Sequence, residues 1–393
     1  MKVQARRFPL INALRALAAL SVLAFHALGL FGGGLRDDAA IRPYVARLES
    51  GVVVFLLISG FLLYRPFVRA RLRGGPVPEA AAFYWRRFLR IVPAYWVALL
   101  VAALVIPLHG VLTGRGLWTY FGFAQIYDHD TIGLAIGPAW TLGLEITFYA
   151  LLPVWAWAVR RTGAPELRAL AGLWLASMAY KAILLATGAV KAGTGPEPAL
   201  VSLPGYLDEF ALGMALAVVS VRFEGRPSPG AVRLVGRRPG LAWLGAGAAF
   251  LLVARGIGLT GDPLQHYSTA QYLARNTLYG VMALCLLLPA VFGDDHRTPL
   301  RRALGSPIPL WLGLISYGIY LYHWPVLLEL TDRDLGSVSG VHPYLLWGVT
   351  TAVLSIALGA ASYYLVERPA LSLRRLVGRP PALPDDTVSE PAP

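Results

Sequence analysis

The chain has 393 residues, of which 56% are hydrophobic and only 15% charged, and its mean hydropathy is +0.57. Ordinary soluble domains carry about 25% charged residues, so this composition excludes a soluble globular enzyme, a disordered protein and a simple nucleic-acid binder. A lone cysteine, Cys285, excludes an intramolecular disulfide. Because a hydrocarbon core about 30 Å thick needs about 20 residues per helix, the length allows about ten spans. The composition therefore predicts an all-α, polytopic integral membrane protein.

Hydrophobic segments of the required length recur along the whole chain. They predict ten transmembrane helices at residues 9–31, 51–68, 92–112, 138–158, 168–188, 205–221, 239–257, 272–292, 308–330 and 343–366. We expect residues 1–370 to form one transmembrane domain, because no internal repeat or second domain is recognisable. Residues 371–393 form a cytoplasmic tail, and from Gly378 onward it holds five prolines without a core pattern. Such a composition is typical of disorder.

The distribution of basic residues orients these helices. With the N-terminus inside, the inner loops and tails collect 25 of the 35 Lys and Arg residues, and the outer loops collect eight. The remaining two, Arg15 and Lys181, fall within spans, and the sequence offers no partner for Lys181. This bias predicts that both termini are cytoplasmic. It also accounts for the net charge of +13 as a topological feature and not as a footprint for nucleic acid.

A basic segment precedes the third span. After a Gly-Gly-Pro-Val-Pro turn at 74–78, aromatic and basic residues predict an amphipathic helix on the inner surface, up to residue 91. Arg86 and Arg90 are four residues apart and Arg87 and Arg90 three, so their guanidinium groups can converge on a phosphate. The alternative is simple anchoring by positive charge.

The first span carries two ionisable residues, Arg15 and His26, and such groups are costly in hydrocarbon. Eleven helical steps of about 100° bring both to one face, about 16 Å apart along the axis. This arrangement suits a long anionic ligand from the cytosol, whose phosphates meet Arg15 while its reactive end reaches His26. Coenzyme A thioesters have this shape. The alternative is an arginine that snorkels inward and a histidine that joins two helices by a hydrogen bond.

The fourth span carries a polar stripe of Thr141, Glu145 and Tyr149, which are four residues apart. Glu145 is expected at a depth similar to that of His26. A carboxylate beside an imidazole can orient the ring and raise its basicity, as general base catalysis requires. The alternative is a buried, protonated carboxyl group that only makes structural hydrogen bonds.

Several further residues are candidates for a pocket and have structural alternatives. In the second span Ser59 precedes Gly60, a pair that more often marks close helix packing than a nucleophile. In the ninth span Tyr320 and His323 share a face, which suits either a pocket wall or an interfacial anchor. The complete set of pocket candidates is Ser59, Trp140, Thr141, Tyr149, Tyr320 and His323. The seven histidines are scattered, without metal-ligand spacing, and neither a phosphate-binding glycine loop nor a dinucleotide fingerprint is present.

In combination, these residues resemble the membrane acyltransferase-3 family, which contains bacterial O-acetyltransferases of surface polysaccharides, lipids and antibiotics. Each motif is weak alone, but their order extends from about residue 8 to 370. The motifs are Arg15 with His26, Phe-Leu-Leu-Ile-Ser-Gly-Phe-Leu at 55–62, Arg86-Arg87-Phe-Leu-Arg90-Ile-Val-Pro93, Trp140 to Pro153, Phe210-Ala-Leu-Gly213-Met214, Ile315-Ser-Tyr-Gly-Ile-Tyr-Leu-Tyr-His323 and Glu367-Arg368-Pro369.

This resemblance implies acyl transfer, most often of acetyl, from cytosolic acyl-CoA to a hydroxyl group of a glycan, glycolipid or secondary metabolite. It implies a catalytic role for His26, which we expect Glu145 to assist, and donor binding by Arg15, Arg86, Arg87 and Arg90. We expect no metal, no permanently bound cofactor and no nucleic-acid partner, and location in the bacterial plasma membrane. Because the chain ends soon after the last span, we expect the stand-alone form; homo-oligomerisation stays open. The alternative function is a transporter or flippase that makes no bond.

Overall fold

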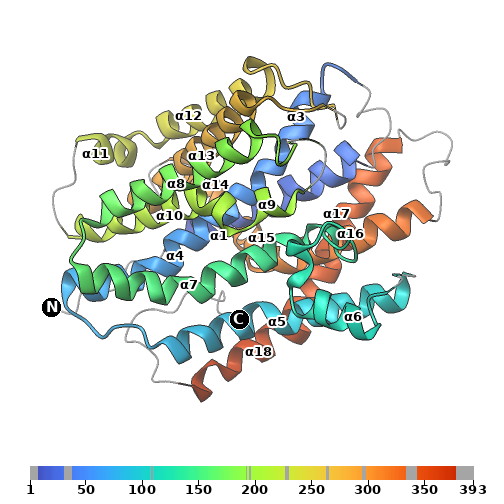
Figure 1. Ribbon diagram of the computed structural model, residues 1–393, viewed down its shortest axis with the longest axis horizontal. Coiled ribbons are helices and arrows are strands. Elements are labelled where there is room, and N and C mark those ends of the chain that lie inside the picture. Colours follow the sequence, from blue (N-terminus) through green and yellow to red (C-terminus); the bar gives the residue numbers. More distant parts are fainter. Residues whose placement is uncertain are drawn as a thin grey trace.

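The computed structural model describes residues 8–30, 38–106, 108, 110–191, 193, 196–225, 230–262, 265–293, 298–332 and 343–377. Within these ranges the chain forms helices and turns and no β-strand, which confirms the all-α prediction. The long helices lie side by side along the longest axis of the molecule (Figure 1).

The first half of the chain contains α1 (Pro9–Ala24), η1 (Phe25–Leu30), α3 (Arg42–Arg47), η2 (Leu48–Ser50), α4 (Gly51–Arg73), α5 (Ala80–Val105), α6 (Gly114–Gly116), η3 (Leu117–Phe121), η4 (Ala124–Tyr127), η5 (Gly137–Ala139), α7 (Trp140–Thr162) and α8 (Glu166–Ala186). The second half contains α9 (Pro198–Val201), α10 (Leu203–Arg222), α11 (Gly230–Arg237), α12 (Pro239–Leu251), η6 (Leu252–Gly256), α13 (Thr269–Phe292), α14 (Pro299–Leu304), α15 (Pro307–Leu314), α16 (Ser316–Asp332), α17 (Pro343–Ser362), η8 (Tyr363–Glu367), α18 (Arg368–Ser372) and η9 (Leu373–Leu376).

Nine helices of the described ranges are long and apolar enough to cross a membrane, and they correspond to nine of the ten predicted spans. The remaining predicted span, the ninth at residues 308–330, is divided between α15 and α16, with the break at Ile315. Hydropathy alone cannot detect such a break, because the sequence on both sides of it is apolar. Close backbone contacts flank it. A Cβ atom at Gly313 would lie 2.0 Å from the carbonyl oxygen of Asn12, and one at Gly318 would lie 2.6 Å from the Cα atom of Gly359.

The basic segment before the third span also differs from the prediction. It is not a separate surface helix, because α5 continues without interruption from Ala80 to Val105 and contains Pro93. The helix is about 39 Å long at about 1.5 Å per residue, so it exceeds a hydrocarbon core about 30 Å thick. The arginines that were expected on a separate surface helix therefore lie in the first turns of the same helix that crosses the membrane.

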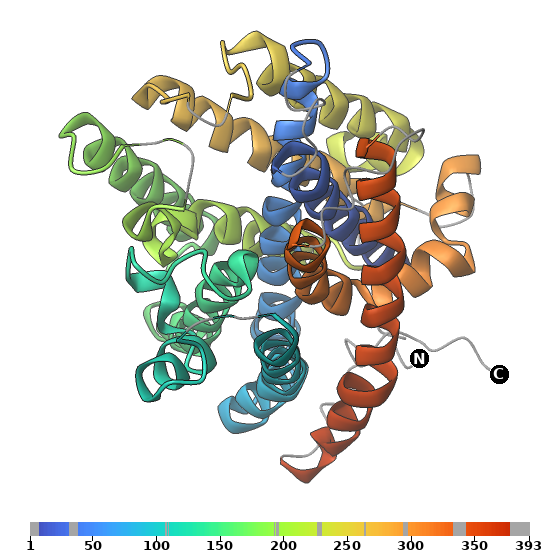
Figure 2. The same cartoon turned by 90° about the vertical axis from the view of Figure 1, so that its right-hand side faces the viewer.

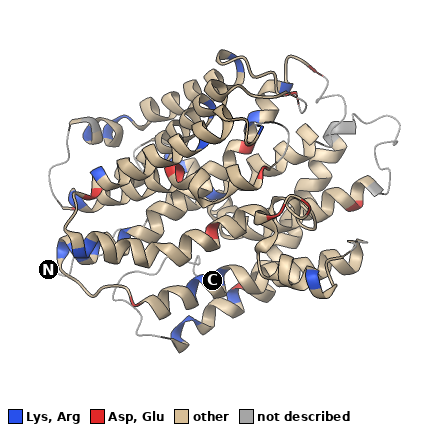
Figure 3. Ribbon diagram, viewed as in Figure 1, with Lys and Arg blue, Asp and Glu red and all other residues tan. Residues whose placement is uncertain are grey.

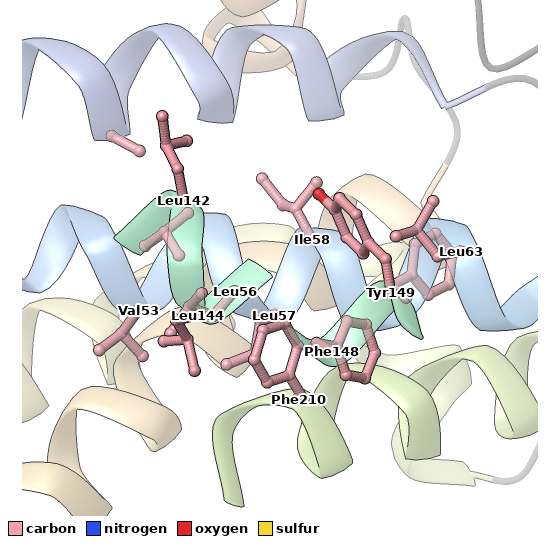
Figure 4. Close-up of a cluster of buried hydrophobic side chains, with 14 of the residues drawn as sticks. Val53, Leu56, Leu57, Ile58, Leu63, Leu142, Leu144, Phe148, Tyr149 and Phe210 are labelled. Carbon is pink, nitrogen blue, oxygen red and sulfur yellow. The ribbon is translucent and has the colours of Figure 1, made fainter. Parts of the chain in front are cut away.

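Helix α4 is the centre of the bundle. It packs against α10, α1, α13 and α7, and α4 and α10 have the largest buried share of the long helices. Figure 4 shows the apolar contact among these helices, with Leu57 of α4 beside Phe148 of α7 and Phe210 of α10. The rings of Phe148 and Phe210 stack with centroids 3.8 Å apart. Aromatic and branched side chains thus hold α7 and α10 against the central helix.

The contact between α4 and α10 depends on two glycines. A Cβ atom at Gly60 would lie 2.5 Å from the carbonyl oxygen of Phe210, and one at Gly213 would lie 2.2 Å from the carbonyl oxygen of Leu57. Both distances are too short for any side chain. The two helices therefore touch backbone to backbone, the arrangement that small residues permit in membrane bundles.

Many of the Lys and Arg residues lie at one end of the bundle, on the left and along the lower edge in Figure 3. We call this the basic end. The C-terminal turns of α4 and α7 and the turn η9 lie there, and they contain Arg71, Arg73, Arg160, Arg161, Arg374 and Arg375. The last of these belong to a continuous helical segment from α17 into η9, which runs along one side of the bundle (Figure 2). The predicted tail thus begins with ordered helical turns, 371–376, and its remainder from Gly378 lies outside the described residues.

Candidate active site

A cavity of about 620 Å³ lies between α1, α4, α5, α7, α16 and the turn η9. Its lining is strongly basic. Among the residues that the structure describes, six arginines and a single carboxylate line it: Arg15, Arg86, Arg87, Arg90, Arg374, Arg375 and Glu145. The other polar lining residues are Ser59, Thr141, Tyr149, Tyr317, Tyr320 and Tyr363. The cavity therefore unites all four predicted donor-binding arginines with four of the six pocket candidates.

Arg15 enters the cavity from α1 and is half-buried there. No hydrogen bond or ion pair to its guanidinium group occurs among the described residues, and its electrostatic neighbours include the carboxylates of Glu145 and Glu367. Charge in such a site is costly unless a partner compensates it. An anion in the cavity would supply that partner.

Arg90 differs from Arg15 because it has a carboxylate partner. Its Nη1 atom lies 3.1 Å from Oε2 of Glu367, which is fully buried at the end of the π-helical turn η8. The guanidinium also lies over the ring of Tyr317, 5.9 Å from the centroid. The hydroxyl group of Tyr317 donates to the carbonyl of Ile91, 2.8 Å away. This network fixes the side chain of Arg90 at the cavity wall.

Glu145 extends from α7 toward α4. Its Oε1 atom accepts a hydrogen bond from the Ser59 hydroxyl at 2.8 Å, and its Oε2 atom accepts one from the Tyr149 hydroxyl at 2.9 Å. Thr141, the third member of the predicted stripe, instead makes a 2.7 Å hydrogen bond with the hydroxyl group of Tyr320. Thus Ser59 contacts the carboxylate directly, and the neighbouring Gly60 provides the close packing.

His26 lies outside the lining of this cavity and pairs with His323 of α16. The Nδ1 atom of His26 is 3.1 Å from Nε2 of His323 and 2.9 Å from the carbonyl oxygen of Val22. The Nδ1 atom of His323 is 2.7 Å from the carbonyl oxygen of Tyr320. The rings of His26 and Trp324 meet edge to face, with centroids 5.3 Å apart.

These contacts determine where the ring protons lie. A carbonyl oxygen only accepts, so Nδ1 of His323 carries a hydrogen and its Nε2, in the neutral ring, is an acceptor. The Nδ1 atom of His26 then carries the hydrogen that Val22 and His323 share. Nε2 of His26 retains a free lone pair and has no hydrogen bond within the described part of the chain. The half-buried His26 ring is therefore arranged to accept a proton.

The backbone at His26 contributes to this geometry. The residues Phe25–Leu30 form the π-helical turn η1, in which amides bond carbonyls five residues back instead of four. The carbonyl of Val22, four residues before His26, accepts a hydrogen bond from the imidazole ring. At this turn the imidazole ring of His26 is therefore hydrogen-bonded to the backbone of its own helix.

The structure does not bring Glu145 into contact with His26, the residue it was expected to assist: Glu145 bonds Ser59 and Tyr149, and His26 contacts Val22 and His323. A similar expected depth in the membrane does not by itself bring two helix faces together. Tyr320 lies between the two regions: it lines the cavity, and its ring centroid is 5.7 Å from that of His323. Trp140 also lies outside the lining, with its ring 5.8 Å from that of Tyr206.

Comparison with known proteins identifies the class of enzyme. A family model described as an acyltransferase domain matches residues 8–364. The chain belongs to the acyltransferase-3 family. It is 27% identical to Nodulation protein 10 of Rhizobium leguminosarum bv. viciae, over 82% of each chain, and 25% identical to Acyltransferase MdmB of Streptomyces mycarofaciens, over 98% of this chain and 97% of that protein. It is also 26% identical to Peptidoglycan O-acetyltransferase OatA of Listeria monocytogenes, over 83% of this chain but 51% of that protein. No solved structure matches.

This acyltransferase-3 protein is thus a multi-pass membrane enzyme that transfers acyl groups to an acceptor. Sequence reasoning missed the contributions of Arg374 and Arg375 to the cavity, since the residues after the last span were assigned to a disordered tail. A usable signal was present, because Leu371, Arg374 and Arg375 have the spacing of one helical face. It also missed the pairing of Arg90 with Glu367, which are 277 residues apart.

Proposed function

We propose that this acyltransferase moves an acyl group, most simply acetyl, from coenzyme A to a hydroxyl group of a glycan, glycolipid or secondary metabolite. The single observation that supports this donor best is the surplus of arginine in the cavity, with Arg15 held there without an acidic hydrogen-bond partner. Coenzyme A carries all its phosphates at one end and a neutral arm at the other. Guanidinium groups bind phosphate in bidentate fashion, so this lining matches the charged end.

In this proposal the phosphates bind Arg15, Arg86, Arg87 and Arg90, and the neutral arm carries the thioester toward Thr141 and Tyr320. Glu145 holds a positioning role: bound to Ser59 and Tyr149, it supplies one negative charge to an otherwise basic wall. The basic end faces the cytoplasm of a bacterial plasma membrane, as the positive-inside rule predicts. Cytosolic acyl-CoA can then reach the cavity from that side.

The chemical step uses His26 as general base. Its Nε2 atom accepts the hydroxyl proton of the acceptor while the hydroxyl oxygen attacks the thioester carbonyl carbon. The carbon–sulfur bond breaks, the sulfur takes the proton from Nε2, and the products are an ester and the free thiol of coenzyme A. His323 accepts the hydrogen bond from Nδ1 and so stabilises the imidazolium that forms transiently.

The test is release of free thiol from acetyl-CoA by the purified full-length protein in lipid nanodiscs, with and without cell-envelope extract as acceptor. We expect release by the wild type, loss of release in His26→Ala and weaker donor binding in Arg15→Ala. His129→Ala is the matched control, because His129 is exposed and pairs with Glu197 away from the cavity. Full release by His26→Ala would overturn the assigned base. Movement of a polar or lipid-linked substrate without thiol release would favour the transporter function instead.

A further inference from the structure

The last helical segment extends beyond the thickness of a membrane. From Leu346 to Leu376 it is continuous over 31 residues, which corresponds to about 46 Å at about 1.5 Å per residue. A hydrocarbon core is only about 30 Å thick, so the final turns belong to the interface or the aqueous phase at the basic end. The segment is tied to α5 there: the indole Nε1 atom of Trp85 donates to the carbonyl of Leu373, 3.1 Å away.

With the final turns held against α5 by this hydrogen bond, one of their faces lines the cavity. Leu371, Arg374 and Arg375 all contribute to the lining, together with Phe83 and Arg86 of α5. Arg374 is half-buried and Arg375 exposed. No hydrogen bond or ion pair involving Arg375 occurs among the described residues. The two arginines therefore form the rim of the cavity at the basic end, farther along the chain than any residue predicted to bind the donor.

The described lining around these two arginines is basic, with six arginines in all. In the described lining the only carboxylate is Glu145, which lies on α7 and is hydrogen-bonded to Ser59 and Tyr149. Like charges that share a confined space repel one another unless an anion neutralises them. A ligand with a single phosphate at the deeper arginines would not extend to the rim.

We propose that Arg374 and Arg375 bind the phosphate of the donor that is farthest from the thioester, the ribose 3′-phosphate of coenzyme A. This inference rests on the proposed function and deepens it. Along the donor the order is thioester, neutral arm, diphosphate and phosphorylated ribose. If the thioester points inward, this order places the diphosphate near the deeper arginines and the 3′-phosphate at the rim. The C-terminal turn thus selects coenzyme A over donors that lack this phosphate.

The test compares binding of coenzyme A and of dephospho-coenzyme A, which lacks only the 3′-phosphate, to the full-length protein in nanodiscs. A charge-assisted phosphate contact contributes about 1.5–3 kcal/mol, so we expect the wild type to bind coenzyme A at least about tenfold more tightly. Arg374→Ala/Arg375→Ala should lose this preference and bind dephospho-coenzyme A like the wild type. That unchanged affinity also shows that the variant is folded.

The matched control is Arg160→Ala/Arg161→Ala, which removes two arginines from the basic end outside the cavity lining and should keep the preference. Equal weakening of both nucleotides in the rim variant would indicate general attraction and overturn the assignment, as would no change for either nucleotide. If the wild type binds neither nucleotide, the proposed donor itself is wrong. Binding of both with equal affinity by the wild type would overturn only the inference about the rim.

Discussion

Lys181 and Arg15 are both cations on helices that can cross a membrane, but their surroundings differ. The ammonium group of Lys181 lies 2.6 Å from Oδ2 of Asp208, whose other oxygen accepts from Ser177 at 2.9 Å. Both charged side chains are almost completely buried, at 1% and 2% exposure. Arg15 lines a cavity and has no such partner in the described structure. The sequence places both cations within spans and offers no partner for Lys181.

The difference shows that an intramembrane charge indicates a site only when its partner is missing. Lys181 and Asp208 compensate each other and join α8 to α10, so their charges are structural. In the described lining of the cavity, arginines outnumber carboxylates, which is why we propose an anionic ligand there. Substitutions of Lys181 or Asp208 should therefore alter stability. Substitutions in the cavity lining, or of His26 and His323, should alter binding or catalysis.

The largest effect is expected for His26→Ala. Removal of a general base typically lowers the rate by about 10²- to 10⁴-fold. We expect kcat for acyl transfer to fall by this range, while the affinity for coenzyme A stays unchanged because His26 lies outside the cavity lining. Steady-state thiol release and equilibrium binding measure the two quantities. A variant that loses donor binding and rate together would contradict the separation of the two regions.

Lys181→Met should act on stability. It leaves the buried Asp208 carboxylate without its cation, a change that costs about 3–5 kcal/mol. We expect a lower thermal unfolding temperature in mild detergent and unchanged donor affinity per folded molecule. The double variant Lys181→Met/Asp208→Asn should regain most of the lost stability, because no unpaired charge remains. A stable single variant with weakened donor binding would reverse our assignment of this pair.

Arg15→Gln should produce the opposite result. The substitution removes one charge-assisted contact with the donor, so we expect about 10- to 100-fold weaker binding of coenzyme A. The unfolding temperature should not fall, since Arg15 has no hydrogen-bond partner within the described structure to leave behind. Arg115→Gln is the control, because Arg115 is exposed, pairs with Asp128, and neither residue lines the cavity. Unchanged donor affinity in Arg15→Gln would remove Arg15 from the binding site.

The smallest effect concerns His323, which orients His26 without belonging to the cavity lining. His323→Leu removes one of the two acceptors for the Nδ1 hydrogen of His26. Loss of this hydrogen bond should lower kcat by about tenfold with little change in KM. His323→Gln retains an acceptor and should recover most of this loss. Nitrogen NMR of the wild type should show His26 protonated at Nδ1. Equal losses in both variants would indicate that His323 only fills space.

Much of this arrangement could be predicted from the sequence, because local periodicity determines it. The face shared by Thr141, Glu145 and Tyr149 follows from helical spacing, and so does the convergence of the arginines on α5. Contacts between distant helices were not predictable in the same way. His26 and His323 are 297 residues apart, and only the packing of α1 against α16 decides that His26 meets this residue and not Glu145.

The break between α15 and α16 was beyond prediction for a related reason. Hydropathy measures whether a segment prefers lipid, and it does not measure whether the backbone hydrogen bonds are continuous. The ordered turns after residue 370 were missed because the prolines from 380 onward dominate the composition of the tail. In both cases tertiary contacts override the local signal.

The backbone contact at Gly60 and Gly213 also affects which changes the enzyme can tolerate. Since peptide groups and not side chains determine the spacing of α4 and α10, the frame of the cavity is independent of the residues that line it. Ser59 and Leu62 face the cavity on the same helix and can be replaced without separating the two helices. One scaffold can therefore evolve to accept new substrates by exchanging its lining, provided that these two positions stay without a side chain.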